Sequence, residues 1–489
     1  MSELPAEQTA LRTTPHPLQR VGAFTLAAMA GVQRADEVIG AVFAEVTGKL
    51  TAAAVTAARA RDKGSEDGFL LACSYSLWPN SPIHNNTAQV YKKKPASELS
   101  EAFKVKNGST LGEFIQRWRT IPAPETWPQA DCVLCGTAAV GFYGKKDVVL
   151  AGAIIHRNTT PRGHAGLALC WPCLCSFYAL PFGCHLTGGS FTALHTWDER
   201  LALHVTRRQV RRNELLLTAG KKPASPKPEV VALAALRGFE HRVTSGVELL
   251  VFKNNNQDQS FASHAVDQPL AEWLRTTTRL PARRTGFRCL LRACRTDKGS
   301  GAQSLAWRVF NRPETIPAVL AAYLTARTQT RSLPAPESPA VAELISSYLH
   351  EVMHMDEKDL SEIRRTAQRV AALFKPDDTG GKLTGFHALF RAGRGTDLRN
   401  WLQRHSVEWV LTRPDNGAPL ITENGFELLF SPSQDGNAWF FRQYLLTSVL
   451  AELHRRGWQP KDAKTVVENF DPDAIDPTDT EALEEGITQ

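Results

Sequence analysis

Apolar residues recur with a helical period over the last third of the chain. Two segments each place five apolar side chains on one face of an α-helix: Val341, Leu344, Ile345, Tyr348 and Val352 in the first, and Leu360, Ile363, Ala367, Val370 and Phe374 in the second. A further helix is expected from Trp439 to Arg456, because Gly457 follows it as a helix-ending glycine. Amphipathic helices of this kind bury their apolar faces against one another. The sequence therefore predicts a helical bundle over residues 313–459.

The first 312 residues combine helical and strand patterns. Helices are expected at residues 21–31, which are small and apolar and end at a glycine, and in the alanine-rich residues 52–61. Residues 247–253 are predicted to form a strand, and an amide-rich loop at 254–259 precedes a partner strand. The predicted class is α+β. It comprises a mixed α/β N-terminal domain over residues 1–312, an inserted zinc-ribbon-like module at about 130–185, and a Lys- and Pro-rich linker at about 220–228.

Two C-x2-C pairs give the sharpest chemical signal. Cys132 and Cys135 form the first pair, and Cys170 and Cys173 form the second. Four thiolates are the ligand set of a closed, structural Zn2+ site, so we predict one zinc ion that joins two hairpins. The alternative is a set of buried free thiols. Cys175, Cys184 and His164 remain as substitutes for one of the four ligands.

The sequence supports a catalytic zinc site less well than a structural one. A base deaminase needs H-x-E upstream of its P-C-x-x-C motif, and no H-x-E precedes Pro172-Cys173. His350-Glu351-Val352-Met353-His354 matches the H-E-x-x-H motif of zinc peptidases and lies on a predicted helix. On that helix both histidines would lie opposite the apolar face, and no third ligand stands out. A zinc metallopeptidase is therefore kept as an alternative function.

Composition and charge indicate a soluble protein with a polyanionic partner. The chain has 489 residues, of which 43% are hydrophobic and 22% charged, and its net charge is +7. Residues 460–489 hold nine acidic and two basic residues, a net charge of −7, so residues 1–459 carry +14. A basic body with an acidic tail suits a polyanion, although an ordinary solvated surface would carry similar charges.

Cysteine usage and hydropathy bear on the compartment. Nine cysteines, four of them expected to bind metal, fit a reducing cytoplasm better than a disulfide framework. The apolar run at residues 21–32 is too short to span a bilayer and lacks a signal-peptide pattern. We expect a cytoplasmic protein without a membrane partner.

Taken together, these segments resemble the large subunit of a type I CRISPR surveillance complex (Cascade), and they are most similar to type I-B large subunits with a zinc-binding middle. The resemblance spans most of the chain. It rests on five segments and on the helical C-terminal part. The segments are His16-Pro17-Leu18 with the helix to Gly31, Asn80-Ser81-Pro82, Cys132-x2-Cys135-Gly136, Cys170-x2-Cys173 with Tyr178-Ala179-Leu180-Pro181-Phe182-Gly183, and the strand from Val247 to Asn254 with its asparagine loop. Cys175 and the acidic tail depart from the pattern.

The resemblance implies a protein that is not an enzyme. Such subunits sit at the 5′ end of the guide CRISPR RNA, recognise the protospacer-adjacent motif in target double-stranded DNA, help to open the duplex and recruit a helicase-nuclease. Expected partners also include the backbone and 5′-handle subunits, small-subunit helical bundles, and a transposition adaptor as an alternative to the nuclease. A free-standing zinc-ribbon DNA-binding protein is the remaining alternative.

Candidate nucleic-acid contacts fall into two kinds. Cations hold phosphates, whereas amides can bond base edges bidentately. Lys92, Lys93 and Lys94 are predicted to contact phosphates, and Arg365 and Arg369, on the outer face of the bundle, are predicted to line a DNA strand. Asn254, Asn255, Asn256 and Gln257 are predicted to read base edges. The alternative is a solvated hairpin tip and an ordinary run of surface lysines.

Overall fold

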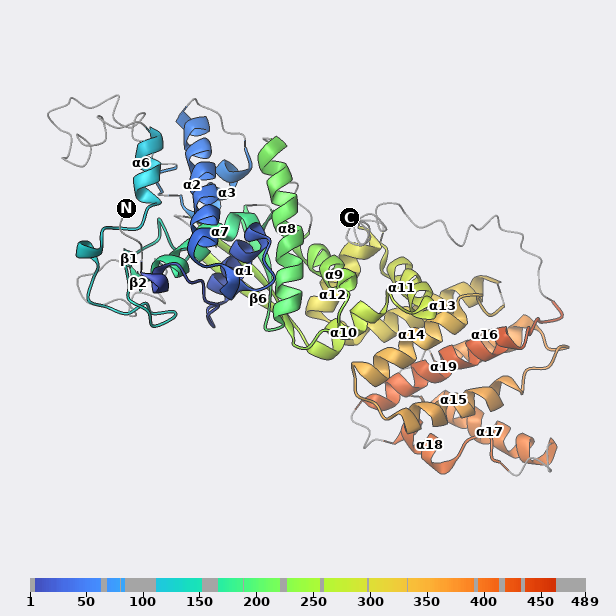
Figure 1. Ribbon diagram of the computed structural model, residues 1–489. Helices are drawn as coiled ribbons and strands as arrows, with labels where there is room; N and C mark the ends of the chain where they lie inside the picture. Colours follow the sequence, from blue (N-terminus) through green and yellow to red (C-terminus); the bar gives the residue numbers. More distant parts are fainter. Residues whose placement is uncertain are drawn as a thin grey trace. The chain divides into compact units, whose positions relative to one another are not determined.

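The structure is a computed structural model that describes residues 5–62, 68–79, 81–83, 111–151, 166–187, 189–219, 227–255, 259–296, 299–331, 333–390, 395–412, 418–431 and 436–462. Lys92, Lys93, Lys94, Asn256, Gln257 and residues 463–489 of the acidic tail lie outside this set. The fold is mixed α+β, as predicted, and it contains two small sheets (Figure 1). Two compact units divide the chain: Met1–Pro228 with Ser245–Ala265, and Glu229–Thr244 with Val266–Gln489.

The first unit is built around helix α7. Its helices are α1 (Pro17–Ala30), α2 (Gly40–Asp62), α3 (Phe69–Leu77), α6 (Leu111–Trp118), α7 (Trp171–Gly183) and α8 (Glu199–Ala219). Every residue of α7 is buried, and α1, α2, α3 and α8 all pack against it (Figure 1). Such complete burial explains why α7 is apolar on all sides and shows no amphipathic period.

Helix α1 matches the sequence prediction closely, whereas α2 begins well before the predicted helix at 52–61. The Nδ1 atom of His16 accepts a hydrogen bond from the Gln19 amide at 3.3 Å, and Gly31 ends α1 in a left-handed conformation with φ of 74°. The alanine-rich segment continues as part of α2. Gly40–Ala60 is long and apolar enough to cross a membrane, a test that core helices also pass, and α2 packs against α1, α3 and α6.

Glycines allow α1 and α7 to approach closely. A Cβ atom on Gly22 of α1 would lie 1.9 Å from the carbonyl oxygen of Ser176, and one on Gly183 would lie 1.8 Å from Oγ1 of Thr25. One turn before Gly22, Nε2 of Gln19 donates to Oγ of Ser176 at 3.2 Å. The small-residue character of α1 is thus a packing requirement.

Both sheets belong to the first unit. Strands β1 (Gly141–Tyr143) and β2 (Leu167–Leu169) form an antiparallel pair. The second sheet has the strand order β3-β4-β5-β6, and its strands are β3 (His185–Thr187), β4 (Ser190–Thr196), β5 (Val247–Asn254) and β6 (Gln259–Val266). Phe191 of β4 and Phe252 of β5 are cross-strand partners that stack at 5.9 Å between ring centroids. The predicted strand at 247–253 and its partner are therefore confirmed.

The described part of the second unit is almost entirely helical. Its helices are α9 (Pro228–Gly238), α10 (Gln268–Thr276), α11 (Pro281–Cys294), α12 (Gly301–Asn311), α13 (Ile316–Arg331), α14 (Ser338–Glu351), α15 (Glu357–Ala371), α16 (Gly380–Ala388), α17 (Thr396–Thr412), α18 (Glu423–Phe430) and α19 (Asn437–Arg455). The predicted apolar faces of α14 and α15 are buried except at Val352, which is half-buried and follows the last residue of α14, and both helices pack against α19. Helix α11 also packs against α14, so the predicted division at 312/313 falls inside this unit.

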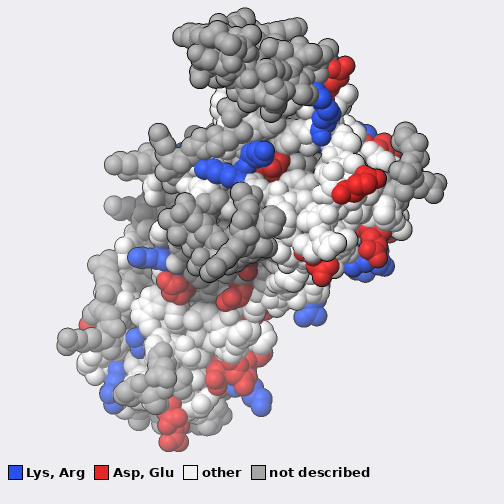
Figure 2. Space-filling model, turned by 90° about the vertical axis from the view of Figure 1, so that its left-hand side faces the viewer, with Lys and Arg blue, Asp and Glu red and all other residues white. Residues whose placement is uncertain are grey.

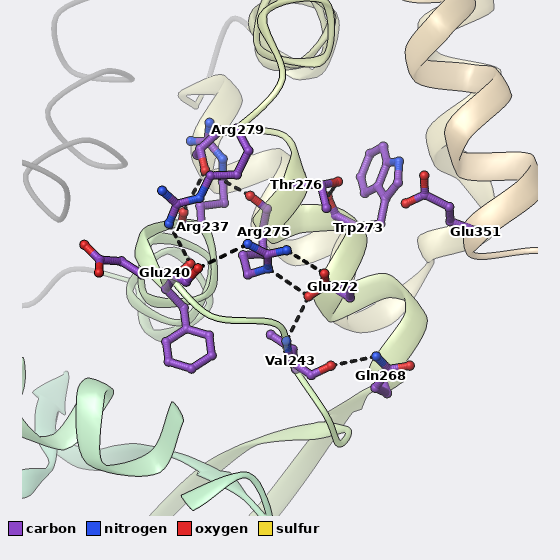
Figure 3. Close-up of polar contacts among 12 residues, drawn as sticks. Arg237, Glu240, Val243, Gln268, Glu272, Trp273, Arg275, Thr276, Arg279 and Glu351 are labelled. Atoms are coloured by element: carbon purple, nitrogen blue, oxygen red, sulfur yellow. Dashed lines mark hydrogen bonds and ion pairs between the residues drawn. The ribbon is translucent and has the colours of Figure 1, made fainter. Parts of the chain in front are cut away.

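Helix α10 holds the loop that follows α9 (Figure 3). The Glu272 carboxylate accepts the Val243 amide at 2.9 Å and two hydrogen bonds from Arg275 at 2.6 and 2.8 Å. Nε2 of Gln268 donates to the carbonyl oxygen of Val243 at 2.7 Å. These contacts fix residues 239–244 within the second unit.

Candidate metal centre

Four cysteines converge at one point of the first unit. The sulfur atoms of Cys132, Cys135, Cys170 and Cys173 all lie within 4.8 Å of one another, and those of Cys135 and Cys170 are 3.4 Å apart. A tetrahedral ion with metal–sulfur bonds of 2.3 Å would set its ligands about 3.8 Å apart. The cluster therefore has the dimensions of a metal site. Among the described residues, no other group of three or more Cys, His, Asp or Glu side chains could hold a metal ion.

The two pairs reach the site on different backbone structures. The first lies on a turn in which the Gly136 amide donates to the carbonyl oxygen of Cys132 at 2.9 Å, and Gly136 takes a φ of 75° that glycine adopts readily. The second pair was predicted to lie on a hairpin, which is wrong. Cys170 is the N-cap of α7 and Cys173 lies in its first turn, where Pro172 favours a helix start.

Gln8, far from the cysteines in sequence, joins the two halves of the site. Its Nε2 atom donates to the carbonyl oxygen of Ala138 at 2.7 Å, beside the first pair. Its Oε1 atom accepts the Trp171 amide at 3.0 Å, beside the second. The side chain is 1% exposed, so both hydrogen bonds are shielded from water. Sequence reasoning missed Gln8, because a single glutamine in a short helical turn carries no pattern.

Proximity of the four sulfurs perturbs their pKa values in opposite directions. At Cys132 the hydrogen bond with Cys135 raises the pKa, but those with Cys170 and Cys173 outweigh it and lower the pKa to about 6. Hydrogen bonds from Cys132, Cys170 and Cys173 lower the pKa of Cys135, whereas hydrogen bonds with Cys132 and Cys135 raise the pKa of Cys170 and Cys173. Four thiolates cannot share this space without a cation, since each charge disfavours the next. A bound cation would allow all four to ionise.

The alternative ligands do not belong to the cluster. Cys175 and Cys184 are buried outside the four-sulfur group, and burial raises the pKa of both thiols. His164 lies outside the described residues. The four cysteines of the two C-x2-C pairs are thus sufficient for tetrahedral coordination.

The H-E-x-x-H segment does not form a peptidase site. Helix α14 ends at Glu351, so the predicted helix carrying both histidines is wrong. His354 takes a φ of 56°, and Nδ1 of His350 lies 3.0 Å from the carbonyl oxygen of Met355. The Glu351 carboxylate pairs with Arg283, at 3.1 Å between Oε2 and Nη1. The histidines therefore do not share a helix face, as that motif requires.

Asn254 is placed where it cannot read a base. Its side chain is fully buried, and Nδ2 donates to the carbonyl oxygens of Leu77 at 2.7 Å and Lys145 at 3.3 Å. Its Oδ1 atom accepts from Nε2 of Gln259 at 2.7 Å. The predicted role in base readout is therefore wrong for Asn254. Asn255 is half-buried, and its carbonyl oxygen accepts from Nζ of Lys145 at 3.0 Å.

Substituting Asn254 by alanine should lower stability rather than sequence specificity. The change strips buried carbonyl oxygens of their donor, which should reduce the free energy of unfolding by about 2 kcal/mol. Urea denaturation of the full chain measures this loss. Asn255→Ala is the matched control and should change stability by less than about 0.5 kcal/mol. Equal stability of Asn254→Ala and the unaltered protein would contradict the structural role.

The nucleic-acid candidates among the described residues are divided between the two units. Arg365 is 59% exposed and pairs with Glu362 at 2.7 Å, whereas Arg369 is half-buried. Asn254 and Asn255 belong to the first unit, and both arginines belong to the second. On the face drawn in Figure 2, basic and acidic side chains are interspersed among the described residues and form no single basic patch.

Comparison with protein-family models, with curated proteins and with solved structures finds no match to this chain.

Proposed function

We propose that this chain is the large subunit of an RNA-guided DNA surveillance complex of the type I CRISPR kind. In this role it would hold the guide-bound complex on target duplex DNA, recognise the flanking motif, aid opening of the duplex and recruit a helicase-nuclease. One observation carries the proposal. Several of the separate segments on which the sequence resemblance rests contact one another within the first unit.

Contacts among these segments are direct. Helix α1, which follows His16-Pro17-Leu18, packs against α7, which carries the second cysteine pair and residues 178–183. The first cysteine pair joins the N-terminus of α7 through the sulfur cluster. Asn254, at the end of β5, donates to the carbonyl oxygen of Leu77, one residue before Trp78 and close in sequence to Ser81. These contacts between segments far apart in the sequence support the proposal.

We also propose that the ion is a single Zn2+ with a structural role. Tetrahedral four-sulfur sites select zinc or iron, and zinc holds such a site without redox chemistry. Four protein ligands leave no open coordination position for a substrate. In the proposed arrangement the metal module, at about residues 130–185, is an insertion in an α+β domain that precedes a C-terminal helical bundle.

Co-expression with type I-B backbone subunits, the 5′-handle subunit and a guide CRISPR RNA tests the assignment. The chain should co-elute with the guide RNA on gel filtration, in a fixed ratio to the handle subunit. Omitting the guide is the control and should release the chain as a free protein. A chain that elutes alone in the presence of all partners would overturn the proposal, and sequence-specific DNA binding by that free chain would favour a stand-alone regulator.

A further inference from the structure

Helix α8 combines five arginines with a long stretch that lacks acidic residues (Figure 1). From Arg200 to Asn213 the sequence contains no Asp or Glu. The arginines of this stretch are Arg200, Arg207, Arg208, Arg211 and Arg212. The stretch therefore carries a charge of +5 with His204 neutral.

One face of α8 is fixed against α7 through Asn213. Its Nδ2 atom lies 2.9, 2.9 and 2.8 Å from the carbonyl oxygens of Pro181, Phe182 and Cys184, at the C-terminus of α7. Nε2 of Gln209 donates to Oδ1 of Asn213 at 2.8 Å, and both amide side chains are buried. This network sets the rotation of α8 about its axis, so side chains on the far side of the helix from Asn213 point away from α7.

Three arginines lie toward that outer face, and we call them the α8 arginine cluster: Arg208, Arg211 and Arg212. At about 100° per residue they lie between about 100° and 160° from Asn213 around the helix axis. Arg211 is exposed, and Arg208 and Arg212 are half-buried. Residues at i, i+3 and i, i+4 are neighbours on a helix surface, with Cβ atoms about 5–6 Å apart. The three arginines therefore share one compact patch of that surface.

Within the described part of the chain, the cluster has no acidic partner. Arg207 is engaged elsewhere, because Nη2 donates to the carbonyl oxygen of Val32 at 2.6 Å and Nη1 donates to Oε1 of Gln33 at 3.1 Å. The three cluster arginines form no ion pair or side-chain hydrogen bond with any described residue, Glu214 of the same helix included. Their charges are therefore not used to hold the fold together.

Arg208 shows that the arrangement is incomplete. Its Nη1 atom is buried and has no hydrogen-bond partner in the described part of the chain. Burial lowers the pKa of Arg208, because it disfavours the charged guanidinium group. Like charges at a spacing of i, i+4 repel one another, and a buried donor without an acceptor costs free energy. A bound anion with several acceptor oxygens would offset both costs.

An exposed indole ring lies at the N-terminal end of α8. Trp197 is 54% exposed and directly precedes Asp198, whose Oδ1 atom accepts the Leu201 amide at 3.1 Å. The guanidinium group of Arg20 lies 4.9 Å from the centroid of the Trp197 ring, and Arg20 pairs with Glu199 at 3.3 Å. Trp197 is thus held at the helix start while much of its side chain remains in contact with water. Exposed aromatic rings are surfaces on which unpaired bases stack.

We propose that α8 binds single-stranded nucleic acid, with phosphates on the α8 arginine cluster and an unpaired base stacked on Trp197. This inference rests on the proposed function and adds to it a surface for unpaired strands. Guanidinium groups form bidentate hydrogen bonds with phosphate oxygens. Trp197 and Arg208 are 11 residues apart, which is about 16 Å along the helix axis, or about five stacked nucleotides. A duplex keeps its bases paired inside, so it could use the cluster but not the indole ring.

Fluorescence anisotropy of the purified full chain with three labelled probes, over a range of salt concentrations, tests the proposal. The probes are an oligouridylate, an oligothymidylate of the same length and a DNA duplex. The cluster variant carries Arg208→Gln, Arg211→Gln and Arg212→Gln. A control variant loses the same charge at exposed positions elsewhere in the first unit: Arg12→Gln, Arg59→Gln and Lys146→Gln. Arg211→Gln alone, at an exposed position, keeps the test valid if circular dichroism shows that the triple variant unfolds.

Loss of three phosphate contacts should lower the slope of log affinity against log salt by about 2 for the single strands, and Arg211→Gln alone should lower it by about 0.7. The control variant should keep the slope of the unaltered protein. Arg→Lys substitution at the three cluster positions should restore most of the slope, because the charge returns. Equal losses in the cluster and control variants would overturn the proposal. So would a duplex that binds as tightly as the single strands and depends equally on the cluster.

Trp197→Ala should weaken binding of both single strands by about tenfold and leave the salt slope unchanged, because stacking releases no counterions. Trp197→Phe keeps an aromatic ring and should retain most of the affinity. Unaltered affinity of the Trp197→Ala variant would overturn the stacking role.

The same assays separate this surface from the proposed function. Cluster-dependent strand binding by a chain that fails to join the guide complex would remove the proposed function and leave the assignment of α8 standing. A chain that joins the guide complex but binds neither single strand would overturn the assignment of α8 alone. Tighter binding of the oligouridylate would support the proposal with RNA as the strand, and tighter binding of the oligothymidylate would support it with DNA.

Discussion

A chain with Cys132→Ser and Cys135→Ser is expected to lose its metal and the folded state of its first unit together. Two of four thiolates disappear, and the remaining pair cannot close a tetrahedral site. Binding of a structural zinc ion contributes about 10 kcal/mol or more to folding in small zinc domains, which is comparable to the whole stability of a typical domain. The zinc content, measured by elemental mass spectrometry, should fall from one ion per chain to none. Most of the protein should become insoluble.

Cys184→Ala provides the control for this result. Cys184 is a buried thiol of the same unit outside the four-sulfur group, so its removal should lower stability modestly and leave the metal content unchanged. Iron in place of zinc would be recognised by its visible absorption. A folded, soluble double-serine variant, or an unaltered protein that is folded without metal, would contradict the assigned site.

Replacing Gly22 by alanine should cause the second large loss of stability. The added methyl group would meet a backbone carbonyl oxygen at 1.9 Å, so α1 would have to move away from α7. A backbone carbonyl group cannot change rotamer to relieve a clash, as a side chain can. We therefore expect a loss of about 3 kcal/mol in the free energy of unfolding. Chemical denaturation monitored by circular dichroism measures this change.

Gly48→Ala is the matched control for the Gly22 variant. Gly48 lies within α2, and a Cβ atom there would meet nothing within 4 Å. The substitution should therefore raise stability by about 0.5–1 kcal/mol, because alanine favours the helix more than glycine does. Similar effects of the two substitutions would show that α1 and α7 are not packed as closely as described.

Local patterns predicted many elements of this fold. The capped helix ending at Gly31, the strand at 247–253 and the amphipathic helices at 341–352 and 360–374 follow from periodicity and end signals. Helix α7 was missed because Pro181 interrupts its sequence and its full burial removes any amphipathic period. An amphipathic period arises only when one face of a helix is exposed to water. A fully buried helix has no exposed face, so its sequence shows no such period.

The candidate site was predictable to a similar extent. Paired cysteines identify metal ligands because coordination fixes their spacing, and all four converge. The spacing of amide side chains does not identify their partner in this way. An asparagine such as Asn254 can donate a hydrogen bond to a buried carbonyl oxygen as well as to a base edge. Gln8 forms two long-range hydrogen bonds, to residues 130 and 163 positions away in the sequence. Contacts over such separations produce no local sequence pattern.

The path of the chain between the two units limits how the gene can be divided. The backbone passes from the first unit to the second after Pro228, returns for Ser245–Ala265 and then leaves again. A fragment that stops at residue 228 would therefore lack β5 and β6, and would expose the edge of β4 that normally pairs with β5. A fragment that stops at residue 265 would instead carry residues 229–244 without their own core. No single break yields two whole units, so truncated versions are expected to be poorly soluble even where the intact chain is not.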